Sequence, residues 1–182
     1  MSDFPLWTAA EAAAATNGTA HGDWSVTGIC IDTREIAPGD LFVALKAARD
    51  GHEFLDAAYN GGAAAALISQ DIGERPCLLV DDTFKALEAL GLASRARSSA
   101  VHAAITGSVG KTSIKEMIAR IFRAGGAAHW SVKSFNNHWG VPLTLARMPR
   151  ETKRAIFEIG MNTPGEIAPR SKMVRPQIAM IT

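Results

Sequence analysis

The sequence predicts an α/β protein in which a small N-terminal α/β domain is followed by a second domain built on a parallel sheet. Three features of the 182-residue chain support this. Strand-like apolar runs alternate with helix-like segments, a glycine-rich loop joins a strand to an amphipathic helix, and hydrophobic residues make up 47% of the chain. We place the domain boundary at Ser98-Ser99, where the apolar periodicity lapses. The first domain then covers residues 1–98 and the second covers residues 99–182.

Capping and turn signals divide the first domain into short elements. Thr8-Ala9-Ala10-Glu11 is a capping box at the start of an alanine-rich helix, which we expect Gly18 to end. Pro38-Gly39 marks a turn before a strand. The apolar runs predict strands at residues 25–31, 40–45, 63–69 and 77–80, and helices at residues 54–60 and 82–97.

Strands and helices alternate strictly in the second domain, with strands expected at residues 101–106, 154–159 and 177–182. This alternation predicts a parallel sheet with ligands at the C-terminal ends of its strands. The helix expected at residues 112–124 has apolar residues at helical spacing, which predicts a stripe facing the core. The stripe comprises Ile114, Met117, Ile118, Ile121 and Phe122, and the other side carries Lys115, Glu116, Arg120 and Arg123. The pattern is still running at Thr182, so we expect this domain to be truncated there.

The glycine-rich loop after residues 101–106 has the composition of a phosphate-binding loop. Gly107 and Gly110 allow the backbone to fold around a phosphate, and the following helix directs the positive end of its dipole there. We expect Lys111 to contact the β- and γ-phosphates of ATP and the Thr112 hydroxyl to ligate Mg²⁺. Ile105 replaces the first glycine of the full motif, and the alternative is a glycine-rich turn with a surface lysine. The predicted ATP-binding residues are Gly107, Ser108, Val109, Gly110, Lys111, Thr112, Ser113, Asn136 and Asn137.

Glu158 stands at the end of the next apolar strand, where the C-terminal edge of a parallel sheet would bring it close to the loop. A carboxylate in that place can reach Mg²⁺ directly or through water, so we predict Thr112 and Glu158 as metal-binding residues. The alternative is a solvated glutamate at a strand end. Asn136-Asn137, in a polar loop at residues 133–140, could bind the γ-phosphate or could stabilise a turn.

Two polar clusters stand between the strands of the first domain. Thr33-Arg34 could bind a diphosphate, because a guanidinium matches phosphate in a bidentate manner. The alternative is that Arg34 pairs with Asp32 or Asp40. His52, in the second cluster, has no partner at metal-ligand spacing, so we interpret it as a structural or hydrogen-bonding residue.

Composition excludes several classes of protein. A net charge of +1 with no basic block argues against a nucleic-acid-binding protein. No apolar run is long enough for a membrane helix, and the N-terminus is unlike a signal peptide. Cys30 and Cys77 lie far apart in apolar runs, which indicates buried, reduced thiols. We therefore expect a cytoplasmic protein.

The motifs occur in a fixed order along the chain. They are Asp32-Thr33-Arg34, residues 38–45, Asp50-Gly51-His52, Asp82-Thr83, residues 106–112 with Lys115-Glu116-Met117, Asn136-Asn137 with Gly140-Val141-Pro142, and Glu158 with Gly165-Glu166-Ile167. Together they resemble the Mur ligase family. Lys115-Glu116-Met117 favours the member of the family that adds a D-alanyl-D-alanine dipeptide.

The resemblance implies a first domain that binds the UDP end of a UDP-N-acetylmuramoyl tripeptide, with Thr33 and Arg34 near the nucleotide. It also implies a central ATPase domain in which Lys111 and Glu158 are catalytic and ATP and Mg²⁺ are bound. The family reaction phosphorylates the substrate carboxylate, and the amine of D-alanyl-D-alanine then attacks the acyl phosphate, in peptidoglycan precursor synthesis. That chemistry requires positioning and charge neutralisation more than a protein nucleophile.

Ala47 departs from the family pattern, which usually has a glycine there. The resemblance also implies a second metal site, an adenine pocket and a dipeptide site beyond Thr182, so this chain alone would be inactive. Two other functions remain open. One is a sister Mur ligase or a ligase like folylpolyglutamate synthase, which should lack Asp32-Thr33-Arg34 together with Asp50-Gly51-His52. The other is a non-catalytic nucleotide-binding module.

Overall fold

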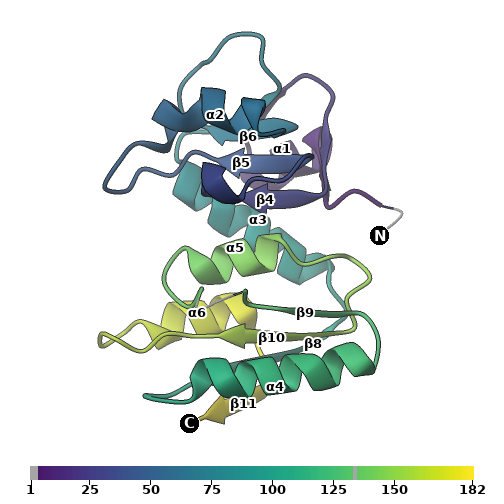
Figure 1. Cartoon of the computed structure of the whole chain (residues 1–182), viewed down its shortest axis with the longest axis vertical. Helices are drawn as coiled ribbons and strands as arrows, with labels where there is room; N and C mark the ends of the chain where they lie inside the picture. Colours follow the sequence, from purple (N-terminus) through teal and green to yellow (C-terminus); the bar gives the residue numbers. More distant parts are fainter. Residues whose placement is uncertain (1–3, 133–134) are drawn as a thin grey trace. The chain divides into compact units, whose positions relative to one another are not determined.

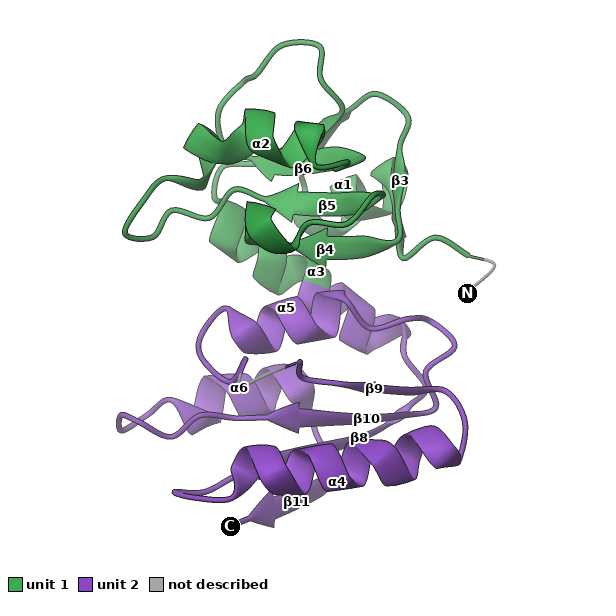
Figure 2. Cartoon of the chain, in the orientation of Figure 1, with its two compact units in different colours: residues 1–90 green, residues 91–182 purple. Residues whose placement is uncertain are grey.

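The computed structural model describes residues 4–132 and 135–182, so Met1–Asp3 and the first two residues of the predicted polar loop, Lys133 and Ser134, lie outside the described residues. The chain forms two compact units, Met1–Leu90 and Gly91–Thr182 (Figure 2). The division falls inside helix α3 (Thr83–Arg97), whereas the sequence places the boundary after it. The assignment of a separate role to each domain stays a prediction.

Unit 1 is built on a five-stranded sheet with the order β2-β7-β6-β5-β4. Figure 1 labels three of these strands, β4, β5 and β6. Strands β4 to β7 are parallel, and β2 joins antiparallel to β7 at one edge. Strands β1 and β3 form a separate antiparallel pair. The elements are β1 (Trp7–Thr8), α1 (Ala9–Thr16), β2 (Thr19–His21), β3 (Ser25–Val26), β4 (Gly28–Cys30), β5 (Asp40–Val43), α2 (Leu55–Asn60), β6 (Ala65–Ile68) and β7 (Cys77–Leu79), with 3-10 turns at Thr33–Glu35 and Gly51–Phe54.

Helix α1 begins at the predicted capping box. The Thr8 hydroxyl accepts a hydrogen bond from the backbone N–H of Glu11, and the Glu11 carboxylate accepts one from the N–H of Thr8. The helix ends at Asn17, which adopts the left-handed conformation with φ 55°, one residue before the expected Gly18. Asparagine tolerates this conformation better than other residues with a Cβ atom, so it can close a helix as glycine does.

The strand predicted at residues 25–31 is two strands. β3 pairs with β1 and β4 pairs with β5, so the chain changes sheets at Thr27. β1 and β2 are not predicted from the sequence, because two or three residues are too few to show the alternation of a strand. Their formation depends on partners far along the chain, such as Cys77–Leu79 for β2.

Unit 2 is a fully parallel four-stranded sheet with the order β11-β8-β10-β9, as predicted for strand–helix alternation. Ala103, Ile105 and Ile156 pack with α4 on one face, and Ala104, Ala155 and Phe157 pack with α5 and α6 on the other. This division follows from the two-residue period of a strand. The elements are β8 (Val101–Thr106), α4 (Lys111–Ala124), β9 (Ala128–Trp130), α5 (Gly140–Ala146), β10 (Arg154–Glu158), α6 (Ile167–Val174) and β11 (Ile178–Ile181).

The core-facing side of α4 differs from the prediction. Met117 and Ile121, expected in the apolar stripe, are 63% and 69% exposed, whereas Lys115, expected on the opposite side, is fully buried. The helix turns Lys115 and Ala119 toward the sheet, with Ile118 and other apolar residues half-buried beside them. A lysine can occupy this line because polar partners are available where its ammonium lies.

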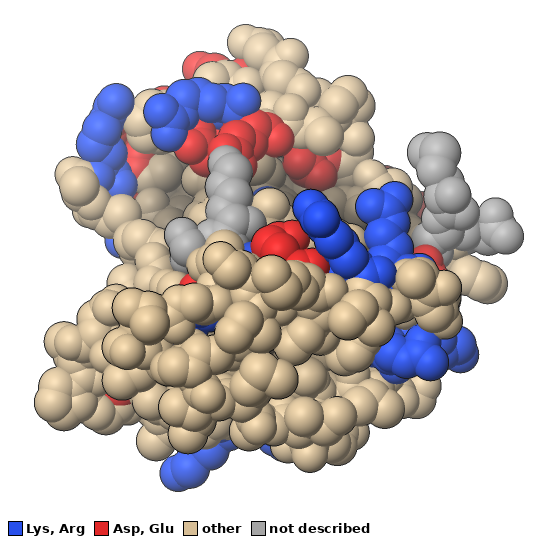
Figure 3. All heavy atoms as spheres, turned by 60° about the horizontal axis from the view of Figure 1, so that its bottom comes forward, with Lys and Arg blue, Asp and Glu red and all other residues tan. Residues whose placement is uncertain are grey.

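Basic and acidic side chains lie intermixed on the face drawn in Figure 3, much of which is uncharged. Exposed apolar residues of unit 2 include Met117 and Ile121 on α4 and Ile178 and Ile181 on the edge strand β11. Within residues 4–132 and 135–182, no helix has the length and apolar character needed to cross a membrane.

Candidate functional site

The glycine-rich loop joins the C-terminal end of β8 to the first residue of α4. Gly107 and Gly110 have φ angles of 137° and 79°, values that residues with a Cβ atom rarely adopt. A Cβ atom on Gly107 would also collide with the backbone oxygen of Thr182, which follows β11. Other residues could therefore form this loop only with backbone strain at these two positions and, at position 107, with a collision.

Lys111 closes the loop on itself. Its Nζ atom donates a 2.6 Å hydrogen bond to the carbonyl oxygen of Gly107, four residues earlier. The first N–H groups of α4 have no partners within the helix, and its dipole adds positive potential at the same end. Lys111 and these N–H groups form the part of the site suited to an anion such as a phosphate.

Glu158 lies at the tip of β10, which is adjacent to β8, and its side chain is almost fully buried at 1% exposure. The Thr112 hydroxyl donates to this carboxylate, at 3.0 Å from Oε2 and 3.2 Å from Oε1. The Asn136 side-chain amide donates a 2.8 Å hydrogen bond to Oε1. Three residues from α4, β10 and the loop after β9 thus meet as the sequence predicts.

The second asparagine of the predicted pair has a different place. The side-chain oxygen of Asn137 accepts a hydrogen bond from the N–H of Gly140, at the start of α5. It stabilises the turn into that helix, which is the alternative use of paired asparagines considered above. Of the two, Asn136 is the one that reaches Glu158.

Lys115 is a residue of this site that the sequence reasoning missed. Its Nζ atom donates to the carbonyl oxygen of Ser131 at 2.6 Å, and lies 2.9 Å from Glu116 Oε1 and 3.9 Å from Glu158 Oε2. The available signal was its spacing, because a residue three positions after Thr112 lies on the same side of a helix. The amphipathic pattern of the surrounding apolar residues concealed it.

The loop borders a hollow of about 260 Å³, whose lining residues are Ser108, Val109, Gly110, Lys111, Thr112, Ser113, Asn136 and Glu158. These are all of the predicted ATP-binding and metal-binding residues except Gly107 and Asn137. Its chemistry is a set of backbone N–H groups and a lysine on one side, and a hydroxyl and a carboxylate on the other. Such a hollow suits a phosphate group accompanied by a cation.

The residues present fit a magnesium ion. The Thr112 hydroxyl uses its hydrogen for Glu158, so its lone pairs remain available to a cation. Mg²⁺ binds hard oxygen ligands and usually takes one or two carboxylates together with phosphate oxygens and water. Across the described parts of the chain, no group of three or more His, Cys, Asp and Glu residues could hold a metal. A cation here would therefore depend on phosphate oxygens as well as on Thr112 and Glu158.

The predicted site residues of unit 1 lie just after β4. Arg34 is 87% exposed in its side chain and forms a bidentate pair with Asp32, with Nη2 at 2.6 Å from Oδ2. Thr33 is the first residue of the 3-10 turn that Asp32 caps. The pairing with Asp32 is one of the alternatives considered for Arg34, and in this conformation its guanidinium is directed to that carboxylate.

His52 has the hydrogen-bonding role expected of it. Its Nε2 atom accepts a hydrogen bond from the N–H of Ser69, so the ring hydrogen must be on Nδ1, which lies 2.6 Å from Asp50 Oδ1. These bonds connect the segments that follow β5 and β6 at the C-terminal edge of the unit 1 sheet. Parallel sheets commonly bind ligands at this edge.

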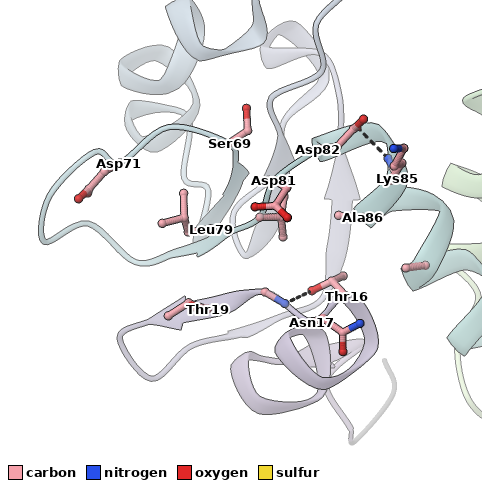
Figure 4. A pocket seen from close by; sticks show the side chains of 13 residues that line it. Thr16, Asn17, Thr19, Ser69, Asp71, Leu79, Asp81, Asp82, Lys85 and Ala86 are labelled. Carbon is pink, nitrogen blue, oxygen red and sulfur yellow. Dashed lines mark hydrogen bonds between the residues drawn. The ribbon is translucent and has the colours of Figure 1, made fainter.

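A larger hollow of about 840 Å³ lies elsewhere in unit 1 (Figure 4). The segment after α1, including Asn17, forms one side, and Asp81 and Asp82 form another. The Asp82 carboxylate accepts hydrogen bonds from the N–H groups of Phe84 and Lys85 and so caps α3. Neither Thr33 nor Arg34 lines this hollow, which has no counterpart among the predicted sites.

Taken together, a glycine-rich loop between β8 and α4 and a buried carboxylate at the tip of the adjacent strand have the arrangement of P-loop α/β proteins. The family model of the Mur ligase middle domain matches residues 105–182. UDP-N-acetylmuramoyl-tripeptide--D-alanyl-D-alanine ligase from Escherichia coli K12 is 42% identical over 168 residues, which cover 91% of this chain and 37% of that protein. The chain belongs to the Mur ligase family.

Solved structures agree with this membership. The corresponding ligase from Acinetobacter baumannii superposes with a TM-score of 0.84 and 35% identity, covering 99% of this chain and 42% of that one. MurF from Thermotoga maritima in complex with ADP has a TM-score of 0.68 and 26% identity, covering 85% and 36%. The chain spans between 34% and 39% of the length of the curated relatives it matches.

Proposed function

We propose that the protein is an ATP-dependent ligase that adds D-alanyl-D-alanine to UDP-N-acetylmuramoyl tripeptide in peptidoglycan precursor synthesis. The relative of this name from Escherichia coli aligns with 91% of the chain at 42% identity. The observation that carries the proposal is the meeting of Thr112, Asn136 and Glu158 beside the glycine-rich loop. A ligase of this kind must neutralise the charge of ATP while a carboxylate is phosphorylated, and this arrangement offers both a phosphate-binding side and a cation-binding side.

The residues of the loop have separate tasks in this proposal. Lys111 exchanges its bond to the Gly107 carbonyl for the β- and γ-phosphates of ATP, and the N–H groups at the start of α4 bind the same oxygens. Ser108, Val109, Gly110 and Ser113 line the phosphate position. Mg²⁺, held by Thr112 and Glu158, supplies charge neutralisation when bound. Asn136 keeps the Glu158 carboxylate oriented.

The reaction then needs no protein nucleophile. The substrate carboxylate attacks the γ-phosphorus and ADP leaves, which gives an acyl phosphate. The amine of D-alanyl-D-alanine attacks the acyl carbon, and inorganic phosphate leaves as the amide forms. The task of the residues is to hold ATP in line with the carboxylate, in agreement with a chemistry of positioning and electrostatic stabilisation.

Unit 1 is proposed to bind the UDP end of the substrate, with Thr33 and Arg34 near the nucleotide. Their position at the C-terminal edge of a parallel sheet supports this role. Binding requires Arg34 to exchange Asp32 for phosphate oxygens, which the high exposure of its guanidinium permits. Cys30 and Cys77 are buried thiols outside any disulfide, which is in keeping with the reducing cytoplasm, where we place the reaction.

The test is a coupled assay of ADP release by the full-length enzyme with UDP-N-acetylmuramoyl tripeptide, D-alanyl-D-alanine, ATP and Mg²⁺, with the product identified by mass. ADP release that requires all the substrates and yields the pentapeptide product supports the proposal. Release with a different amino acid in place of the dipeptide would indicate a sister ligase. Nucleotide binding without turnover, in protein that is folded by circular dichroism, would indicate a nucleotide-binding module.

A further inference from the structure

Lys115 is a fully buried lysine on the side of α4 that faces β9 and β10. It does not line the hollow at the loop, so direct contact with a phosphate is not its task. Burying an ammonium costs free energy unless it is paired and hydrogen-bonded. Because the Lys115 ammonium lies 3.9 Å from Oε2 of Glu158, its positive charge attracts that carboxylate.

Lys115 is linked to Glu158 in two ways. Its Nζ atom donates to the carbonyl oxygen of Ser131, and the hydroxyl of the same serine accepts a hydrogen bond from the backbone N–H of Glu158. The second link is electrostatic, because the positive charge lies 3.9 Å from Oε2. That separation is too long for a hydrogen bond, so the carboxylate oxygens stay available to Thr112 and Asn136.

We propose that Lys115 is a positioning residue that holds the Glu158 carboxylate in the place where it orients the Thr112 hydroxyl toward a magnesium ion. A buried carboxylate without a nearby positive charge moves toward water or other partners. The Thr112 hydrogen would then lose its acceptor, and the lone pairs of the hydroxyl would no longer be directed at the cation. The inference rests on the proposed function only in taking that cation to be the Mg²⁺ that accompanies ATP.

The experiment compares the affinity for ADP with and without Mg²⁺ by titration calorimetry. Lys115→Met keeps the length of the side chain and removes its charge. We expect the gain in ADP affinity that Mg²⁺ provides to fall about tenfold, the size of effect typical of residues that support a metal ligand, while affinity for ADP alone changes less than about twofold. In the turnover assay, kcat should fall while KM for D-alanyl-D-alanine stays constant.

Glu116→Gln is the matched control. Glu116 contacts the same ammonium but is 44% exposed in its side chain, so its charge is screened by water. This variant should keep the magnesium-dependent gain within about twofold of the parent. If Glu116→Gln lowers the magnesium-dependent gain in ADP affinity as much as Lys115→Met does, Lys115 acts through general packing of α4 and the proposal is overturned.

The outcomes separate this inference from the proposed function. A parent protein with no magnesium-dependent gain and no turnover contradicts the proposed function itself. A parent protein with both, matched by Lys115→Met, overturns only the role of Lys115. If Lys115→Met does not fold, Ser131→Ala is the second variant, because it removes the hydroxyl that binds the backbone N–H of Glu158 and leaves every buried charge in place. It should lower the magnesium-dependent gain in ADP affinity. An unchanged gain in that variant overturns the proposed link between Lys115 and Glu158.

Discussion

The two units have similar parallel-sheet edges but arrange their polar groups differently. In unit 2 the key carboxylate, Glu158, is 1% exposed and is bound by side chains from α4 and from the loop after β9. In unit 1 the key guanidinium, Arg34, is 87% exposed and is bound by Asp32, two residues before it. One site is assembled from distant segments in the interior, and the other from a local turn at the surface.

This difference indicates where each site can adapt. An exposed ion pair contributes little free energy, so Arg34 can change partners at low cost when a ligand arrives. A buried carboxylate cannot be left without partners, so Glu158, Thr112, Asn136 and Lys115 depend on one another. Under the proposed function, the polar groups of unit 2 are preorganised for a cation and a phosphate, whereas Arg34 in unit 1 is expected to rearrange on binding. Substitutions of the site residues in unit 2 should consequently have larger effects on activity than the substitution of Arg34 in unit 1 has on binding.

Among the turnover effects, all measured in the full-length enzyme, the largest is expected for Lys111→Ala in unit 2. Loss of the ammonium removes the direct contact to the transferring phosphate, and kcat/KM for ATP should fall about 10³-fold. Added Mg²⁺ should not restore it, because the cation cannot replace a donor on the other side of the phosphate. Lys172→Ala, at an exposed position of α6, is the control and should retain activity. Substantial activity in Lys111→Ala would favour the alternative interpretation, in which the loop is a glycine-rich turn and Lys111 is a surface lysine.

Glu158→Gln should have the next largest effect. The substitution keeps the shape of the side chain but removes the charge, and turnover should fall about 10²-fold, a loss of roughly 2.7 kcal/mol in transition-state stabilisation. Raising the Mg²⁺ concentration should restore part of the activity, in contrast to Lys111→Ala. The measurement is a magnesium titration of kcat for each variant. Parent-like turnover at low Mg²⁺ would mean that Glu158 is a strand-end carboxylate without a role in metal binding.

A smaller effect is expected in unit 1. Arg34→Ala removes a charge-assisted contact to phosphate and should lower the affinity for UDP-N-acetylmuramoyl tripeptide about tenfold. The loss is limited to this size because the guanidinium must leave Asp32 before it can bind phosphate. Calorimetry with the tripeptide substrate measures this change. Arg75→Ala, which removes an arginine with a similar exposed pair to Asp56, should leave the affinity unchanged. Equal affinities for the parent and Arg34→Ala would place the UDP end elsewhere.

The last effect concerns stability rather than activity. It is absent at neutral pH and appears only in acid. Burial lowers the pKa of His102 from 6.5 to about 4, and its ring stacks on Phe157. Neither ring nitrogen of His102 has a hydrogen-bond partner in the described structure. Above pH 6.5 the imidazole of His102 is neutral in both the folded and the unfolded state. As the pH falls from 6.5 toward 4, the unfolded state takes up a proton that the folded state does not, so the free energy of unfolding decreases.

His102→Leu should remove this contribution, which amounts to about 1.4 kcal/mol per pH unit within that window. Part of the acid sensitivity should remain, since the pKa of His129 is also lowered to about 4, chiefly by burial. Denaturant unfolding between pH 7 and pH 4.5 measures the slope. His138→Leu, at an exposed position, is the control. An unchanged slope in His102→Leu would show that this ring takes up a proton without loss of the fold.

Local signals made much of the fold predictable. The capping box at Thr8 is confirmed by its two hydrogen bonds, and the strand at residues 101–106 has the predicted bounds. The helix after the loop begins at Lys111, one residue before the predicted start. These features depend on neighbours within a few residues, which a sequence displays directly. The break at Thr27 depends on strands that come from elsewhere in the chain, and the sequence does not display it.

The sequence by itself determined the glycine-rich loop between a strand and a helix, the parallel alternation of unit 2 and the placement of Glu158 at a strand tip, because each follows from residue type at short spacing. Only the tertiary structure decided that Lys115 is buried beside Glu158, that Asn136 rather than Asn137 reaches the carboxylate, and that Arg34 pairs with Asp32. The physical reason is that a charged side chain is buried or exposed according to the partners that other segments bring to it. Those partners, such as the carbonyl oxygen of Ser131, become neighbours only when the sheet has formed.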